Sequence, residues 1–348
     1  MEAARRLIVT TDPENSEFPF SELRSWITPV EQFYVRNHFP IPELAVPDWR
    51  LRVGPPGAAV ELAIEDLDAL PPRSVVATME CAGNGRRFND PPARGVQWGT
   101  GAVSNGEWSG PSLADVLDTA AIAGGKFAPK GAHIHLTGAD RGRPDGAPRE
   151  IPYRRSLPRE KALDPDTLVA LRLNGEPLTA EHGAPARVVV PGWYGMASVK
   201  WLVAIEPSDR SSEDHYMTAD YTRRTPDGGL EPLDWMEPKA EIARPADGAQ
   251  VKAGTNIVVG AAWTGAAPLA SVEVSIDGGQ GWRPALLDGP ATRYAWRLWR
   301  WTWDARPGRH RLAARAADAE GRGQPDSPDP AAPGYLNHWV RPRTVTVA

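Results

Sequence analysis

The sequence predicts a two-domain protein, with a mixed domain of strands and a few helices over residues 1–237 and an all-β sandwich over residues 238–348. A chain of 348 residues with 41% hydrophobic side chains is long enough to bury two cores. Its 33 glycines and 36 prolines favour short strands and turns over helical bundles. The hydrophobic pattern changes after the turn-rich segment 226–234, which we predict to connect the two domains.

The first domain contains hydrophobic runs of strand length that are separated by loops. The predicted strands are Asp48–Val53, Ser74–Met79, Ala132–Leu136 and Ala186–Val190. Helical spacing of apolar residues occurs in Pro111–Asp118, which starts with Pro and Ser, and over the shorter segment Ile64–Leu67. Strands therefore outnumber helices in this domain.

The second domain shows strict alternation of side chains. Val272, Val274 and Ile276 lie on one face and lead into an Asp-Gly-Gly turn, and Trp301 and Trp303 alternate in the same way. About a hundred residues with this pattern match the size of an immunoglobulin-type sandwich. The tryptophans of residues 282–303 can form either a carbohydrate platform or core packing, and packing is the better general explanation.

Bulk charge and cysteine content exclude several classes of protein. The net charge of −5 provides no overall attraction for nucleic acid or for an acidic membrane. A single cysteine rules out an internal disulfide and a Cys-rich metal cluster. Met1–Val9 is not followed by the apolar stretch of an export signal, so we expect a cytoplasmic chain, or a periplasmic one if a leader was removed.

The single cysteine, Cys81, stands where a hydrophobic strand meets the turn Ala82-Gly83-Asn84-Gly85 and the pair Arg86-Arg87. Residue type alone favours a buried, inert thiol. The arginines favour the thiolate form, and a thiolate is a good ligand for a soft metal. Charged residues next to a core also carry a desolvation cost that an anionic ligand would offset. These neighbours therefore favour a functional Cys81.

Two further segments collect cationic and donor groups. Arg36 and His38 share one side of an extended chain, because side chains alternate with a period of two. His182, Arg187 and Lys200 surround one strand and a glycine-flanked loop, an arrangement typical of an anion cradle. The pair His133 and His135 lacks a third candidate ligand, so we interpret it as part of a strand.

Together these segments resemble the molybdenum-binding domain of the sulfite oxidase family, which includes the molybdenum domain of plant nitrate reductase. The resemblance covers nearly the whole chain. The matching segments are Phe33–Pro42, Glu80–Arg87, Trp98–Val103 with Trp108–Gly110, Asn174–Leu178 with Glu181–Gly183, Val188–Trp201, Tyr294–Trp299 and Asn337–Trp339.

The resemblance implies an α+β fold that holds molybdenum on molybdopterin, followed by an immunoglobulin-like domain. It implies that Cys81 is the protein's ligand to the metal. The implied cofactor-binding residues are Arg36, Asn37, His38, Asp140, His182, Arg187, Ser198, Val199 and Lys200. The implied substrate-pocket residues are Arg36, Arg86, Trp98, Tyr153 and Arg293, with Arg87 and Arg297 as alternatives for two of the arginines. Gly85 and the bulky pair Trp193-Tyr194 depart from the family pattern, and the latter is expected to alter access to the cofactor.

The resemblance also implies an activity. We expect oxidation of sulfite to sulfate by oxygen-atom transfer, with electrons passed to a separate acceptor such as a cytochrome c. We expect a homodimer that engages neither nucleic acid nor membrane. The alternatives are a reductase of nitrate or of a sulfoxide on the same cofactor, and a β-rich binding protein in which Cys81 is inert.

Overall fold

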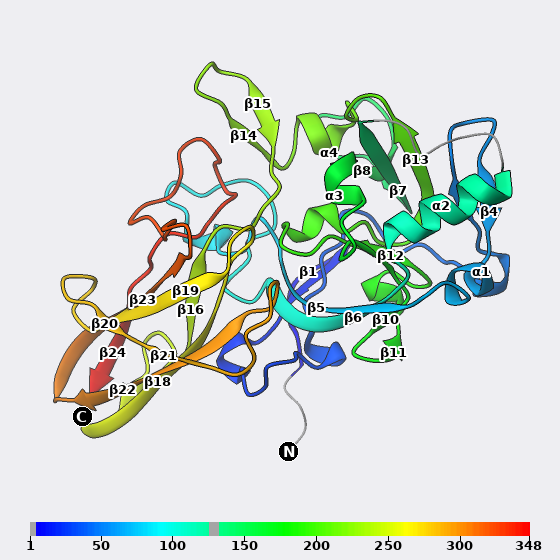
Figure 1. The fold of residues 1–348 in the computed structure, drawn as a ribbon. Coiled ribbons are helices and arrows are strands. Elements are labelled where there is room, and N and C mark those ends of the chain that lie inside the picture. Colours follow the sequence, from blue (N-terminus) through cyan, green and yellow to red (C-terminus); the bar gives the residue numbers. More distant parts are fainter. Residues whose placement is uncertain (1–4, 125–131) are drawn as a thin grey trace.

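The computed structural model describes residues 5–124 and 132–348, so part of the segment examined for an export signal, residues 1–4, lies outside the described residues. The elements up to β15 form one lobe and those from β16 onward gather in a second lobe (Figure 1). In the part of the chain that the structure describes, no helix is long and apolar enough to cross a membrane.

Two sheets form the body of the first lobe. One has the strand order β11 (Glu176–Pro177), β10 (Arg172–Leu173), β6 (Val103–Gly110) and β5 (Arg73–Glu80). The other has the order β4 (Val60–Leu62), β3 (Leu51–Val53), β13 (Leu202–Ser208), β7 (His133–Gly142) and β8 (Ile151–Pro158). Two-stranded pairs complete the lobe: β1 (Leu7–Thr11) with β2 (Glu14–Glu17), β9 (Leu168–Ala170) with β12 (Arg187–Val189), and β14 (Thr222–Arg224) with β15 (Leu230–Pro232).

The α-helices of this lobe are short. They are α1 (Ile64–Asp68), α2 (Leu113–Gly124), α3 (Arg159–Ala162) and α4 (His215–Thr218). At the start of α2 the Ser112 hydroxyl accepts a hydrogen bond from the Asp115 amide at 3.0 Å and donates one to the Asp115 carboxylate at 2.7 Å. This is the cap expected where a Pro-Ser pair precedes a helix.

The sequence predicted the main elements of this lobe. The four predicted strands correspond to β3, β5, β7 and β12, and the two predicted helices to α1 and α2. The expected connector, 226–234, instead spans the turn and second strand of the β14–β15 hairpin. A Gly-rich turn suits a hairpin as well as a linker. The chain then returns to the first lobe, where the Tyr194 amide donates to the Asp234 carbonyl at 2.8 Å.

The second lobe is a two-sheet sandwich, as predicted. One sheet has the order β16 (Lys239–Arg244), β18 (Gly254–Trp263), β22 (Arg297–Ala305) and β21 (Leu286–Asp288). The other has the order β17 (Gln250–Val251), β24 (Arg343–Val347), β23 (Gly308–Asp318), β19 (Leu269–Ser275) and β20 (Arg283–Pro284). Trp296, Trp299 and Trp303 are buried, so these tryptophans pack in the interior and do not form a surface platform.

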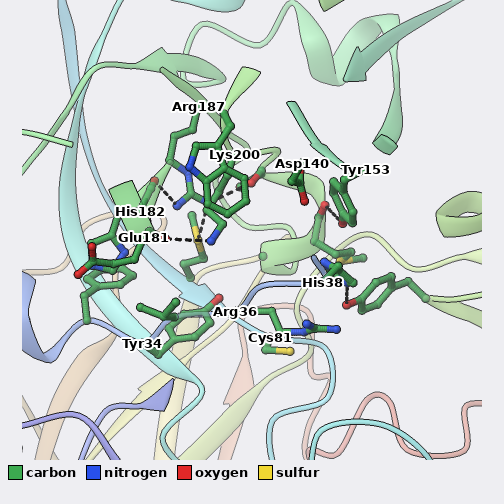
Figure 2. Close-up of a pocket in the computed structure, with 18 residues that line it drawn as sticks. Tyr34, Arg36, His38, Cys81, Asp140, Tyr153, Glu181, His182, Arg187 and Lys200 are labelled. Atoms are coloured by element: carbon green, nitrogen blue, oxygen red, sulfur yellow. Dashed lines mark hydrogen bonds between the residues drawn. The ribbon is translucent and has the colours of Figure 1, made fainter. Parts of the chain in front are cut away.

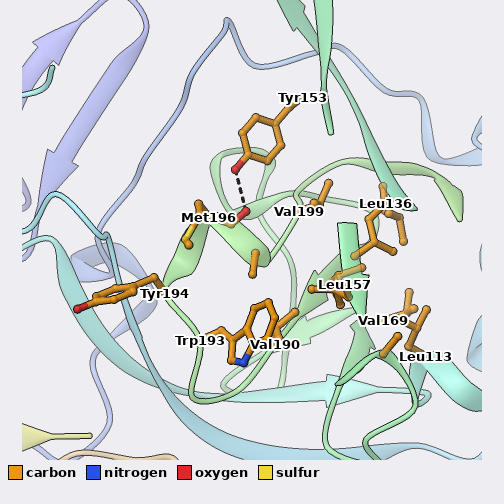
Figure 3. Packing of buried hydrophobic residues seen from close by; sticks show 14 of the residues in the cluster. Leu113, Leu136, Tyr153, Leu157, Val169, Val190, Trp193, Tyr194, Met196 and Val199 are labelled. Carbon is orange, nitrogen blue, oxygen red and sulfur yellow. Dashed lines mark hydrogen bonds between the residues drawn. The ribbon is translucent and has the colours of Figure 1, made fainter. Parts of the chain in front are cut away.

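The core of the first lobe lies directly behind the loop 191–199. Val190, Met196 and Val199 pack with Leu136 and Leu157, which come from β7 and β8 (Figure 3). Trp193 and Tyr194 are buried in the same cluster. The bulky pair that departs from the family pattern therefore fills the core, and neither residue lines the pocket described below.

Candidate functional site

A pocket lies where the end of β5 meets the segment 33–38 and the loop 195–201. Residues from all three segments point into it (Figure 2). Cys81 and Arg36 lie at one end of the pocket as drawn, and His182, Arg187 and Lys200 at the other. The two cationic segments identified in the sequence therefore meet Cys81 in one cavity.

Backbone hydrogen bonds hold Cys81 at the base of the pocket. Its amide donates to the Ala102 carbonyl at 2.9 Å, and its carbonyl accepts from the Asn84 amide at 2.8 Å, which closes the turn. Gly85 has a φ of 96°, a left-handed conformation that favours glycine. Its insertion before the arginines is therefore explained by the shape of the turn. Cys81 is only 5% exposed.

Arg36 and His38 face the same end of the pocket as Cys81. Arg36 donates to the Asn37 carbonyl and to Asn15 Oδ1, the latter at 3.3 Å. Burial opposes the charge on Arg36, but the Tyr221 hydroxyl and the Cys81 thiol outweigh burial and raise its pKa. Burial, together with Arg36 and Lys200, holds the pKa of His38 well below its ordinary value, so this imidazole is neutral at pH 7.

The opposite end of the pocket is strongly cationic. The Arg187 guanidinium donates to the His182 and Ser198 carbonyls at 3.1 and 3.0 Å, and lies 4.9 Å over the Trp108 ring. Lys200 donates to the Glu181 carbonyl at 2.8 Å and to the Asn37 side chain. Burial lowers the pKa of Arg187 to about 10. Burial, Lys200 and Arg187 lower that of His182 to about 3. Two carboxylates, Asp140 and Glu181, line the pocket beside these donors.

Asp140 and Tyr153 were also predicted as site residues, and both line the pocket. The Asp140 carboxyl is buried and its Oδ1 atom has no partner among the described residues. Burial raises the pKa of Asp140 to about 6, although Lys200 and Arg36 oppose the rise. The Tyr153 hydroxyl donates to the Met196 carbonyl at 2.7 Å (Figure 3). The Tyr153 ring stacks on His38 with centroids 4.5 Å apart. Tyr153 therefore supports the pocket mainly through its ring.

Several predicted residues lie close to the pocket without lining it. Asn37 is buried and contacts Lys200, and Val199 belongs to the hydrophobic core. Ser198 does line the pocket, and its hydroxyl accepts from the Val190 amide at 3.1 Å. Trp98 packs in the same cluster as Cys81, and its Nε1 atom lacks a partner among the described residues.

The predicted substrate arginines are mostly elsewhere. Arg86 is buried and donates to the Gly334 and Val96 carbonyls at 2.8 and 3.2 Å, with its guanidinium 4.9 Å over the Tyr335 ring. Arg87 and Arg293 are exposed, and Arg297 donates to the Asp288 carbonyl at 3.4 Å. Of the arginines predicted for the substrate pocket, the pocket-lining residues include Arg36 alone.

Tyr34 and Tyr221 line the pocket and were missed by the sequence analysis. Tyr34 shares the period-two face of Arg36 and His38, so the alternation that identified those residues also predicts it. Tyr221 carries no such signal. Its hydroxyl lies 2.6 Å from His38 Nε2, and its φ of 57° is unusual for a residue other than glycine. Such backbone strain is common at functional sites.

The residues present fit an anionic, sulfur-bearing cofactor. No group of three or more His, Cys, Asp and Glu side chains able to hold a metal occurs within residues 5–124 and 132–348, so a metal at Cys81 needs ligands from a cofactor. The Asp140 Oδ1 and Arg187 Nε atoms are buried and lack partners in the described chain. A side chain at Gly195 would place a Cβ 2.6 Å from the Tyr34 hydroxyl, so glycine keeps this wall open.

Comparisons with known proteins agree with this arrangement. Residues 38–216 match the oxidoreductase molybdopterin binding domain, and residues 238–314 match a bacterial Ig domain. The mitochondrial sulfite oxidase of Rattus norvegicus is 36% identical over 307 residues, which is 82% of this chain and 55% of that protein. The sulfite oxidase of Arabidopsis thaliana is 33% identical over 355 residues, which is 91% of this chain and 87% of the relative.

A solved structure is also similar. The sulfane dehydrogenase SoxCD of Paracoccus pantotrophus superimposes with a TM-score of 0.86 at 29% identity, covering 98% of this chain and 88% of that one. The chain spans between 55% and 61% of the length of the mammalian sulfite oxidases from rat and human. The matched domain and relatives show an oxidoreductase and not a β-rich binding protein. The chain belongs to the sulfite oxidase family of molybdopterin-binding oxidoreductases, and its cofactor is molybdenum held by molybdopterin.

Proposed function

We propose that this chain oxidises sulfite to sulfate and passes the electrons to a separate acceptor such as a cytochrome c. The observation that carries the proposal is the pairing of Cys81 with Arg36 at one end of a pocket whose other end is lined by His182, Arg187 and Lys200. One end suits a soft metal beside a small anion. The other suits the anionic part of a large cofactor.

The cationic end would hold the pterin and its phosphate. Arg187 and Lys200 offer charged donors, and the unpartnered Asp140 oxygen offers an acceptor for ring N–H groups. Burial lowers the pKa of Arg187, Lys200 and His182, which means that it destabilises their cationic forms. A bound anion would stabilise these cationic forms. When bound, the cofactor supplies a molybdenum centre able to exchange oxygen and to accept two electrons.

The chain's own residues would orient the substrate beside Cys81. The Arg36 guanidinium can form paired hydrogen bonds to a sulfite oxyanion, and its position is fixed by Asn15 and the Asn37 carbonyl. The Tyr221 hydroxyl, 2.6 Å from His38 Nε2, lines the same pocket as Arg36. Since His38 is held neutral, it adds no charge to the site, and Arg36 is the cation that selects an anion at this end.

Molybdenum analysis and sulfite turnover test the proposal. The full chain, produced in a host that makes molybdopterin, should contain about one molybdenum per chain and reduce ferricyanide or cytochrome c when sulfite is added. Cys81→Ser should abolish turnover, and Arg36→Gln should raise KM for sulfite without loss of molybdenum. A loaded protein that ignores sulfite but is reoxidised by nitrate or a sulfoxide would instead be a reductase.

We further propose that residues 1–237 form the catalytic domain and residues 238–348 a dimerisation domain. Ile257 on β18 and Leu286 on β21 are each 57% exposed on strands of one sandwich sheet, with β22 between them. Large exposed apolar side chains grouped on one sheet favour a protein contact. Light scattering of the full chain should give the mass of a dimer, and Ile257→Lys should shift it to that of a monomer.

A further inference from the structure

Glu80, the residue before Cys81, lies against the second lobe. Side chains of a strand alternate between two faces, so the residue next to the pocket-facing Cys81 points away from the pocket. Glu80 meets Lys239 of β16, with its Oε1 atom 2.9 Å from the ammonium nitrogen. Both side chains are only 2% exposed. The strand that ends at the metal ligand is therefore joined to the sandwich domain by a fully buried ion pair.

Two more donors besides Lys239 bond the Glu80 carboxylate. Trp263 of β18 donates from Nε1 to Glu80 Oε2 at 2.8 Å, and Asn84 donates from Nδ2 to Oε1 at 2.9 Å. Lys239 donates a second hydrogen bond to the Asn84 carbonyl at 3.2 Å. A single lysine of the sandwich domain thus contacts the residue before Cys81 and the residue that closes the turn after it.

The sandwich domain also holds the edge of β5 upstream of this pair. The Thr78 amide donates to the Tyr294 carbonyl at 2.9 Å, and the Trp296 amide donates to the Thr78 hydroxyl at 2.7 Å. After the turn, the Leu336 amide donates to the Ala82 carbonyl at 3.1 Å. Contacts from four segments of the second domain therefore surround the strand and turn that present Cys81.

A buried ion pair is not by itself a strong source of stability, because apolar side chains of similar size often do as well. It does impose one geometry, since both charges must stay paired and hydrogen-bonded. We propose that Lys239 and Glu80 are positioning residues through which the immunoglobulin-like domain fixes the orientation of the Cys81 thiol. This proposal rests on the proposed role of Cys81 as metal ligand.

Because Cys81 is the single cysteine of the chain, thiol alkylation reports on this turn alone. Three cofactor-free full-length proteins should be labelled with iodoacetamide at pH 7: the natural sequence, the Lys239→Met variant and the Glu80→Gln variant. Each variant should react roughly tenfold faster, the change that follows when the turn opens more readily by about 1.4 kcal/mol. Equal labelling rates in all three proteins would overturn the proposal.

Two further variants separate positioning from general destabilisation. Arg343→Met removes one of the two arginines that pair with Glu241 within the same domain, and it should leave the labelling rate unchanged. The double variant Glu80→Gln with Lys239→Met removes both buried charges. It should recover stability in urea yet keep the fast labelling, because the link between the domains is still missing. Labelling at the natural rate in the double variant would contradict the proposal.

A spectroscopic readout on the loaded protein completes the test. The Mo(V) electron paramagnetic resonance spectrum is sensitive to the orientation of the thiolate on the metal. Its g values should shift in Lys239→Met and stay unchanged in Arg343→Met; no shift in either would count against the proposal. If the purified protein holds no molybdenum, the proposed function fails, while the labelling rates still decide whether the second domain positions Cys81.

Discussion

The Tyr221 hydroxyl lies 2.6 Å from the Nε2 atom of His38, and the two side chains close the Cys81 end of the pocket. Tyr221 reaches this position with a φ of 57°, and its phenol is buried, which raises its pKa. The nearby Tyr153 hydroxyl is instead committed to the Met196 carbonyl. The Tyr221 hydroxyl thus has a side-chain partner that can donate or accept, whereas the Tyr153 hydroxyl must donate to its carbonyl, and we propose that Tyr221 is the tyrosine that contacts a substrate beside Arg36.

Replacing Tyr221 with Phe should lower kcat/KM for sulfite by roughly 10- to 100-fold, as expected for the loss of a hydrogen bond worth about 1.5–3 kcal/mol. Molybdenum content should stay the same, because the ring remains in place. Tyr153→Phe is the matched control and should change turnover less, since its hydroxyl bonds a backbone carbonyl. Steady-state kinetics with ferricyanide check both values. The opposite ranking of the two variants would assign the substrate contact to Tyr153.

Arg36 and Arg86 should respond differently to the same substitution. Arg36→Gln should raise KM for sulfite by about tenfold or more, because a charge-assisted hydrogen bond is lost in the pocket. Arg86→Gln should instead lower the free energy of unfolding by about 1–3 kcal/mol, since it removes the hydrogen bonds to the Val96 carbonyl and to the buried Gly334 carbonyl, which keeps only its bond from Asn337. Urea unfolding and substrate titration of both variants separate the roles. A large rise in KM for Arg86→Gln would show that Arg86 reaches the substrate.

Asp140 should destabilise the cofactor-free chain at neutral pH. Its pKa is raised to about 6 in the folded state by burial, above the ordinary 3.8, so ionisation costs stability as pH rises between these values. Asp140→Asn should therefore be more stable by about 2–3 kcal/mol at pH 8, and the difference should vanish near pH 4. Urea unfolding at several pH values measures it. The same variant should retain less molybdenum, because the amide offers the pterin a donor in place of one acceptor.

His182 should lower the stability of the folded chain as pH falls, the opposite of the effect of Asp140. Its pKa falls to about 3 in the folded state, from 6.5, chiefly through burial. The unfolded chain therefore binds more protons below pH 6.5, and stability is lost as pH falls, by at most about 1.4 kcal/mol per pH unit for this one group. His182→Gln should make the decline between pH 6 and pH 4 shallower. If the free energy of unfolding of the cofactor-free chain, measured in urea, falls with pH as steeply in the variant, a group other than His182 causes the decline.

Local patterns predicted the elements of the fold well, because strand alternation and helix spacing depend on nearby residues. β5, α2 and the alternating strands of the sandwich all appear where the sequence placed them. The same patterns predicted a connector at 226–234 but not the hairpin that this segment forms there, because a hairpin turn and a linker share one composition. They also missed Tyr221, whose place in the pocket depends on a strained backbone angle after α4 and not on its neighbours in sequence.

Residue chemistry and spacing in the sequence were sufficient to single out Cys81, Arg36, His38, His182, Arg187 and Lys200, because each carries its chemistry in a recognisable local motif. Only the tertiary structure decided which of the remaining candidates face the pocket. Arg86 follows Cys81 by five positions, yet the turn directs its guanidinium to the Gly334 carbonyl. Glu80 is adjacent to Cys81, yet strand alternation sends it to Lys239, 159 residues away. Such long-range pairs arise when packing brings the domains together, and no local pattern in the chain encodes them.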